Sequence, residues 1–89
     1  MKDVNLLRTL SKKGGTELLH ILESDEKIYS EIKEEAELSN GTTQRRLKEL
    51  SELGLVEAEA KLTAGGKPVK SYNITDRGRK VIETLNEII

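Results

Sequence analysis

The spacing of apolar residues changes from helical to strand-like at Gly54, and this change limits the folds open to the chain. Before Gly54, Leu47, Leu50 and Leu53 recur at the spacing of one helix face. Glycine readily adopts the left-handed conformation that ends helices. From 56 to 62, apolar and polar residues alternate, as they do in a strand with one apolar face. The sequence therefore predicts a helix that ends at Gly54 and leads directly into a strand.

The predicted strand is the first half of a hairpin. Residues 63–68 read TAGGKP, and the two glycines and the proline are typical of a turn. Residues 69–74 predict the second strand, and Thr75 or Asp76 can cap a last helix. A β-hairpin placed between two helices is thus expected.

Four helices are expected before the hairpin. Thr16 can cap the second, which would run to about Glu23, and Ser39 or Asn40 can cap the fourth. The apolar residues at helical spacing in the first three are Leu6, Leu7, Leu10, Leu18, Leu19, Ile21, Leu22, Ile28, Ile32 and Ala36. This order of elements, mainly α with one small β-hairpin, is that of a winged helix-turn-helix domain.

Length and composition exclude several classes of protein. A chain of 89 residues suits one small domain, and 35% hydrophobic with 35% charged residues is typical of a soluble globular protein. No apolar run approaches the roughly 20 residues that span a bilayer, so we expect a cytoplasmic protein that does not contact membranes. Cysteine is absent, which excludes disulfides and thiolate metal sites. No cofactor, no metal site and no enzymatic activity are expected.

The charges are unevenly distributed along the chain. The net charge is −1, whereas a uniformly basic DNA-binding domain would have a pI above about 9. Residues 38–50 nevertheless hold three bases and one acid, and 61–73 hold three bases and no acid. Residues 14–37 hold eight acids and two bases. A fold that brings the two basic blocks together would form one basic face on an acidic body.

The fourth helix has a polar face that begins with cationic and amide side chains. With Leu47 at the centre of the buried face, Gln44, Arg45 and Lys48 fall on the outside together with Thr42. Acids appear only later in this helix. An ordinary solvated face with ion pairs inside the helix would look similar. A winged helix fold favours contacts with bases or phosphates instead.

Two motifs make the chain resemble known regulators. RLKELSELGLV ends the segment IYSEIKEEAELSNGTTQRRLKELSELGLV, and YNITDRGRKVI joins the second strand to the last helix. Together they resemble the MarR and HxlR type of prokaryotic winged helix transcription regulators. The resemblance implies one winged helix domain over 1–89, with the helix-turn-helix at about 28–53, the hairpin, or wing, at about 55–74 and the C-terminal helix at about 76–88.

The same resemblance implies sequence-specific binding of double-stranded DNA and regulation by occupying an operator. The fourth helix would read the major groove, and the wing would reach the backbone or the edge of a minor groove. The residues predicted to contact DNA are Ser39, Asn40, Thr42, Thr43, Gln44, Arg45 and Lys48 in the helix-turn-helix, and Lys61, Lys67 and Lys70 in the wing. Tyr72 is assigned to the core at the base of the wing.

The chain departs from the pattern of this family at three positions. The family usually has a small residue where this chain has Lys33, a glycine where it has Glu37, and an aliphatic residue where it has Thr43. We therefore expect the turn before the fourth helix to differ in detail, and the packing beneath Thr43 to be looser.

Apolar residues at both ends of the chain predict a homodimer formed through the terminal helices. They exceed what so small a domain needs to cover: Val4, Leu7, Leu10, Ile82, Leu85, Ile88 and Ile89. The two helices could instead pack on each other within one chain. A further alternative is a winged helix used for protein assembly without nucleic acid, which the net negative charge favours. The sequence does not identify an operator or an effector.

Overall fold

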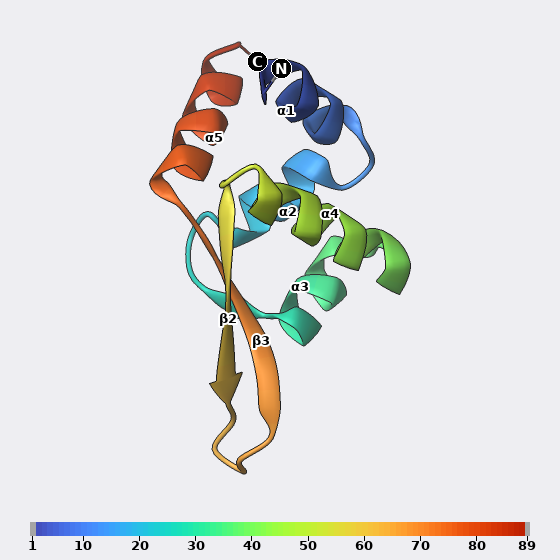
Figure 1. Cartoon of the computed structure of the whole chain (residues 1–89), viewed down its shortest axis with the longest axis vertical. Coiled ribbons are helices and arrows are strands. Elements are labelled where there is room, and N and C mark those ends of the chain that lie inside the picture. Colours follow the sequence, from blue (N-terminus) through green and yellow to red (C-terminus); the bar gives the residue numbers. More distant parts are fainter. Residues whose placement is uncertain (1, 89) are drawn as a thin grey trace.

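The computed structural model describes residues 2–88, which form five helices and a three-stranded antiparallel sheet in the winged helix-turn-helix arrangement (Figure 1). The elements are α1 (Lys2–Ser11), α2 (Gly15–Leu22), β1 (Lys27–Ile28), α3 (Tyr29–Ala36), α4 (Asn40–Glu52), β2 (Val56–Leu62), β3 (Pro68–Ile74) and α5 (Asp76–Ile88). The predicted fourth helix, hairpin and last helix are confirmed. No helix in this part of the chain is long and apolar enough to cross a membrane.

The core is built around α2. Leu18, Leu19 and Leu22 are fully buried, and they meet buried leucines and isoleucines from the other elements. Ile82 of α5 is 1% exposed, so it belongs to this core and does not remain available for a contact with a second chain as predicted. Burying side chains of this size stabilises a fold by about 1.5–3 kcal/mol each, and α2 therefore anchors the helices around it.

Side-chain caps fix the starts of α4 and α5. The Ser39 hydroxyl accepts a hydrogen bond from the Thr42 amide at 3.1 Å, which confirms Ser39 as the N-cap of α4. The Thr75 hydroxyl accepts from the Gly78 amide at 3.0 Å and donates to the Gly54 carbonyl at 2.7 Å. Thr75 thus caps α5 and also fastens its start to the end of α4.

The predicted cap of α2 was wrong. Thr16 lies inside α2, and the residue at the N-cap is Gly14, which has a φ of 87° and provides no side-chain bond. A Cβ on Gly14 would lie 2.6 Å from the Leu38 side chain. The close packing of Leu38 and the left-handed backbone therefore place the cap two residues earlier than the hydroxyl pattern indicated.

The turn between α3 and α4 begins at Glu37, the residue that follows α3. This glutamate has a φ of 54°, the left-handed conformation that glycine adopts most easily. It is the one non-glycine residue with a positive φ in the described part of the chain. Glu37 thus adopts the backbone conformation that a glycine takes more easily, at a cost in strain, and the expectation that this turn differs in detail stays a prediction.

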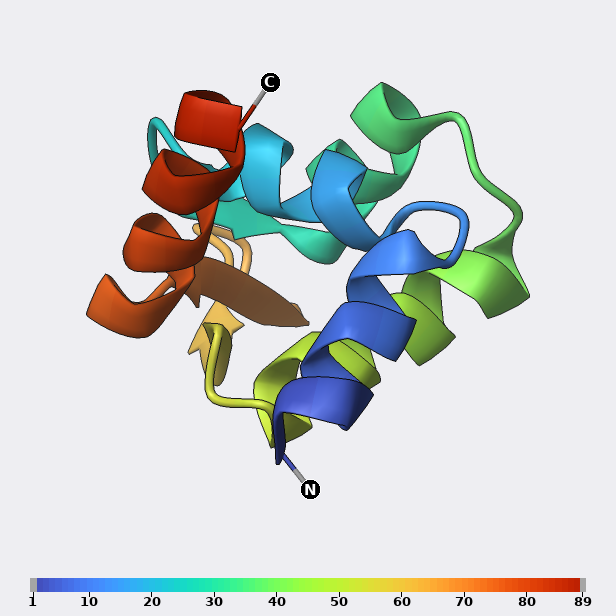
Figure 2. The ribbon, with the colours of Figure 1, turned by 90° about the horizontal axis from the view of Figure 1, so that it is seen from above.

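The hairpin projects from the helices, away from α1 and α5 (Figures 1 and 2). Its strands pair from Val56 opposite Ile74 to Leu62 opposite Pro68. Since side chains alternate between the two sides of a strand, the hairpin has two faces. The inner face carries Val56, Ala58, Ala60, Leu62, Pro68, Lys70, Tyr72 and Ile74, and the outer face carries Glu57, Glu59, Lys61, Val69, Ser71 and Asn73.

The strand β1 was not predicted. It contains only Lys27 and Ile28, which pair with Tyr72 and Ser71 of β3. Two residues are too few to show a period in sequence, and the pairing depends on a strand more than forty positions away. β1 fixes the start of α3 against the hairpin.

Candidate nucleic-acid interface

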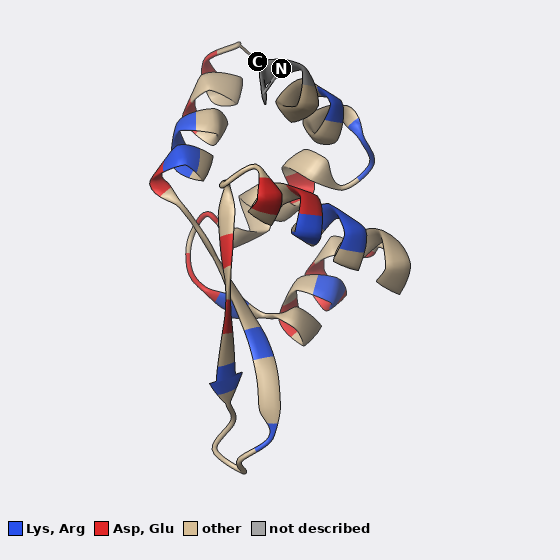
Figure 3. Ribbon diagram, viewed as in Figure 1, with Lys and Arg blue, Asp and Glu red and all other residues tan. Residues whose placement is uncertain are grey.

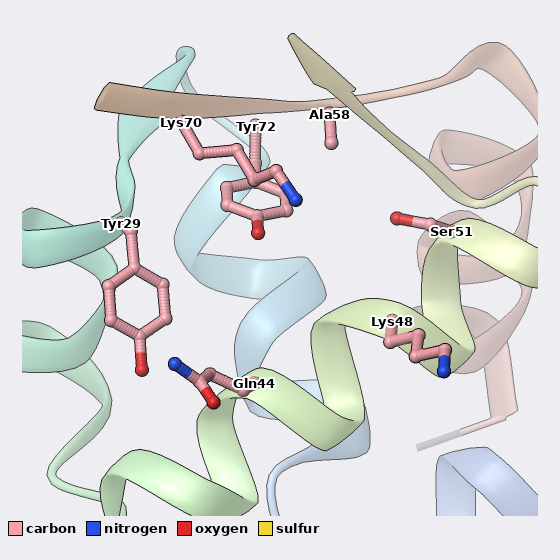
Figure 4. Close-up of a pocket in the computed structure, with 7 residues that line it drawn as sticks. All are labelled: Tyr29, Gln44, Lys48, Ser51, Ala58, Lys70 and Tyr72. Carbon is pink, nitrogen blue, oxygen red and sulfur yellow. The ribbon is translucent and has the colours of Figure 1, made fainter. Parts of the chain in front are cut away.

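A hollow lies between α4 and the inner face of the hairpin (Figure 4). Gln44, Lys48 and Ser51 line it from α4, where their i, i+4, i+7 spacing places them on one stripe. Lys70 lines it from β3. The other lining residues are Tyr29, Ala58 and Tyr72. The stripe of α4 and one lysine of the hairpin, Lys70, therefore face the same space. The DNA-binding hypothesis drawn from the sequence requires such an arrangement.

Several exposed cations of α4 and the hairpin carry no ion pair, and two of them, Lys48 and Lys70, line the hollow. Among the side chains that the structure describes, those of residues 5–88, the cations Arg45, Lys48, Lys67 and Lys70 make no ion pair, and all four are exposed. Figure 3 shows cationic segments on α4 and on the half of the hairpin nearer its tip. Lys48 and Lys70 give the hollow an attraction for a polyanion, and Arg45 and Lys67 add exposed positive charge to the same two elements.

The acids of α4 are turned toward α1. Glu49 accepts from Arg46 and also from Lys12 at 3.1 Å, which links α4 to the end of α1. Glu49 and Glu52 line a cleft with Arg8 and Lys12, apart from the stripe that carries Gln44. The carboxylates of α4 therefore do not oppose an anion at the hollow.

Arg46 is a cation that the interface does not use. It is 7% exposed, and its guanidinium bonds to Glu49 while its Nε has no hydrogen-bond partner. Its side chain packs beside Gly14, at the junction of α1 and α2. Arg46 thus belongs to the packing of α4 on the body.

The start of α4 is held by side-chain hydrogen bonds. Ser39 donates to the Thr42 hydroxyl at 2.9 Å, and Asn40 accepts from the Tyr29 hydroxyl through its side chain and, at 3.3 Å, its carbonyl. Ser39 and Asn40 are exposed and Thr42 is half-buried, so all three can be reached from solvent. The predicted contact residues of this turn therefore also position the helix.

Thr43 must be removed from the predicted set. Its side chain is fully buried, and its hydroxyl donates to the Ser39 carbonyl at 2.9 Å. The packing beneath Thr43 is therefore not loose, because the threonine fills the place of an aliphatic residue and satisfies its own hydroxyl. A side chain in this position cannot contact DNA.

Lys61 lies apart from the other predicted wing lysines. It projects from the outer face of the hairpin, whereas Lys70 projects from the inner face. Its ammonium binds the Glu26 carboxylate, which raises the pKa of Lys61 and lowers that of Glu26. Lys61 is thus engaged with an acid on the side facing away from α4.

Tyr29, Ser51 and Ala58 were not predicted for this site. The spacing of Ser51 from Gln44 and Lys48 was readable in the sequence, because all three fall on one helical stripe. Tyr29 reaches the hollow only through the folding of α3 against α4, which no local pattern indicates. Burial raises the pKa of the Tyr72 phenol, with a smaller effect from Tyr29, and favours the neutral hydroxyl.

The site offers hydrogen-bond donors and positive charge but no reactive centre. Its polar groups are amide, hydroxyl and ammonium groups. Among the described side chains, residues 5–88, no group of three or more His, Cys, Asp or Glu residues could hold a metal ion. This chemistry suits the binding of an anionic surface.

Comparison with models of protein families shows to which family the chain belongs. The sequence model of the PadR-like family of transcriptional regulators matches residues 6–84. The chain belongs to this family. As a PadR-like regulator it is a DNA-binding regulator by family and fold, and the predicted relationship to winged helix transcription regulators is confirmed. No curated protein sequence matches it significantly.

Solved structures with the same fold include regulators from several bacteria. Reduced YodB, a transcriptional regulator from B. subtilis, is 24% identical with a TM-score of 0.81, over 92% of this PadR-like chain and 79% of its own. The transcriptional repressor BigR from Xylella fastidiosa is 24% identical with a TM-score of 0.77, over 97% and 84% of the two chains. A protein assigned to the MarR family from Porphyromonas gingivalis W83 is 23% identical with a TM-score of 0.78, over 92% and 79%. The TM-scores show a shared fold, and at identities this low the likeness shows the fold alone.

Proposed function

We propose that this PadR-like chain binds double-stranded DNA at specific sequences and regulates transcription by occupying an operator. In this proposal α4 enters the major groove, and the hairpin contacts the backbone or the adjacent minor groove. The observation that carries it is the hollow between Gln44 and Lys48 of α4 and Lys70 of the hairpin, which no carboxylate lines.

Each proposed contact follows from the chemistry of its side chain. Gln44 can pair with adenine through N6 and N7, and Arg45 can pair with guanine through O6 and N7. Lys48, Lys67 and Lys70 carry unpaired charges suited to phosphates. Ser39, Asn40 and Thr42, at the amino end of α4, would contact the backbone beside the major groove. Thr43 and Lys61 have no part in this set.

We also propose that the regulator acts as a homodimer formed through α1 and α5. An apolar groove lies between these helices and is lined by Leu6, Leu7, Leu10, Val81, Leu85 and Ile88. Leu7 is 68% and Ile88 75% exposed. The side chain of Val4 and the whole of Ile89, which were also predicted to contribute, lie outside the described residues. α1 and α5 lie at the end opposite the hairpin tip, so a dimer formed there leaves the hairpin free (Figure 1).

The DNA-binding proposal can be tested with duplexes selected from a random-sequence library. Fluorescence anisotropy should give an affinity that falls steeply between about 50 and 200 mM salt, because phosphate contacts release counterions. The double variant Arg45→Ala, Lys48→Ala should bind at least about tenfold more weakly. Gln44→Ala should relax the selected sequence at one position, whereas Lys48→Ala should weaken all duplexes alike.

Two results would overturn the proposal. One is the absence of any enriched sequence together with binding that does not depend on salt. The other is purification with one fixed protein partner that covers Gln44 and Lys48 and resists nuclease, which would favour a protein-assembly module. The pI of 5.9 is the observation that favours this second function. Thr16→Ala, on a helix away from the hollow, is the control for folding.

A further inference from the structure

The tip of the hairpin exposes an apolar pair. Leu62, at the end of β2, is 71% exposed and lies directly opposite Pro68, which is also exposed. The other two exposed large hydrophobic residues in the described chain, Leu7 and Ile88, line the groove between α1 and α5. Leu62 is far from that groove, so the proposed dimer does not cover it (Figure 1).

The position of this pair is more informative than its exposure. A single exposed leucine is ordinary on a protein surface. Leu62 and Pro68, however, lie on the inner face of the hairpin, the face that carries Lys70 and borders the hollow. Lys67 precedes Pro68, and no acid occurs from 60 to 70. The apolar pair therefore lies among cations on the side proposed to meet DNA.

We propose that Leu62 and Pro68 pack into the minor groove at A·T base pairs, while Lys67 and Lys70 bind the phosphates on its two edges. This inference rests on the proposed DNA-binding function. The deoxyribose walls of a minor groove are apolar, and leucine and proline are among the residues that proteins insert there. The two lysines supply the charge complementarity that identifies DNA as the occupant.

The preference for A·T pairs follows from the groove floor. A G·C pair places the guanine 2-amino group in the minor groove, and an A·T pair does not. Leu62 cannot accept a hydrogen bond from that amino group, which would lose its water without gaining a partner. The apolar pair would also meet it sterically. The wing thus adds sequence preference outside the base pairs that α4 reads.

Inosine provides the decisive test. An inosine·cytosine pair lacks the 2-amino group but keeps the major-groove edge of G·C. In a duplex from the selection, each A·T pair that flanks the sequence read by α4 is changed first to G·C and then to inosine·cytosine. At the pair beneath the wing, the wild-type chain should bind the G·C duplex about five- to tenfold more weakly. Inosine·cytosine should restore the affinity.

Variants of the hairpin tip assign this effect to Leu62. Leu62→Ser should bind the A·T duplex as weakly as the wild type binds the G·C duplex, and should no longer distinguish the three duplexes. Its salt dependence should be unchanged, because no cation is removed. Leu62→Met should retain the preference. Lys67→Ala should lower the salt dependence but keep the preference, which separates apolar from ionic contacts.

The outcomes separate this inference from the function on which it rests. If Leu62→Ser binds and distinguishes all three duplexes as the wild type does, the apolar contact is absent while DNA binding stands. If no flanking pair shows the inosine effect in the wild type, the inference is likewise overturned. If the wild type selects no duplex at all, the proposed function fails and the inference fails with it. An unchanged melting temperature for Leu62→Ser shows that the fold is intact.

Discussion

Lys48 of α4 and Lys70 of β3 border one hollow from its opposite sides, and neither ammonium is paired with an acid whose side chain the structure describes (Figure 4). The two lysines belong to elements that meet only because β2 runs directly from the end of α4. A DNA backbone near the hollow would meet both charges. This relationship connects α4 with the hairpin.

Removing either lysine should change the salt dependence of DNA binding. Lys48→Ala and Lys70→Ala should each weaken binding and lower the slope of log affinity against log salt by about one, because each removes one phosphate contact. Lys61→Ala should leave the slope unchanged, since Lys61 projects from the outer face and pairs with Glu26. Anisotropy titrations at several salt concentrations measure all three. An equal change for Lys61→Ala and Lys70→Ala would contradict the assignment of the two faces.

The sequence already indicated that Lys61 and Lys70 lie on different faces of the hairpin, because side chains alternate along a strand. In the predicted strands, Lys61 alternates with Leu62 and shares its side with Glu57 and Glu59, whereas Lys70 shares its side with Tyr72. The prediction that Lys61, Lys67 and Lys70 all contact DNA did not use this alternation. The alternation of side chains with a period of two predicted the strands. The same alternation also indicates that Lys61 and Lys70 lie on opposite faces of the hairpin.

The parts of the fold that could not be predicted depend on distant contacts. Arg46 is charged, and only the turn between α1 and α2, packed over it, explains why it is buried. Tyr29 joins the site because α3 folds against α4, where its hydroxyl bonds to Asn40. Sequence periodicity reports which side of a helix is apolar, and it does not report which neighbour will cover a polar side chain.

Glu37→Gly should stabilise the protein. Its φ of 54° is strained for an L-residue by about 1–2 kcal/mol, and a glycine removes the strain at some cost in chain entropy. We expect a net gain of about 1 kcal/mol in the free energy of unfolding, measured with urea. Glu34→Gly, in the interior of α3, should lose about 1 kcal/mol. A loss of stability in Glu37→Gly would show that the glutamate side chain matters more than the backbone strain.

Glu49→Ala should destabilise the protein more than Glu52→Ala. Glu49 is the acid that pairs with the buried Arg46, and removing it leaves a guanidinium with no counter-ion inside the fold. We expect a loss of about 3 kcal/mol, against less than about 0.5 kcal/mol for the exposed Glu52. Adding Arg46→Met to Glu49→Ala should recover most of the loss, because the buried charge is then gone. Equal urea midpoints for the two single variants would contradict this role of Glu49.

Leu7→Glu should separate the proposed dimer into single chains. Leu7 lies on the groove between α1 and α5 and is 68% exposed, so a carboxylate there stays solvated in one chain but would be buried between two. Asn5→Glu adds the same charge to the same helix outside the groove and should leave the dimer intact. Sedimentation should give a mass near 10.0 kDa for Leu7→Glu and twice that for the wild type and Asn5→Glu. The single chain should bind one half-site, whereas the dimer should prefer two half-sites about 34 Å apart. A wild-type chain that sediments as one copy at micromolar concentration would contradict the dimer.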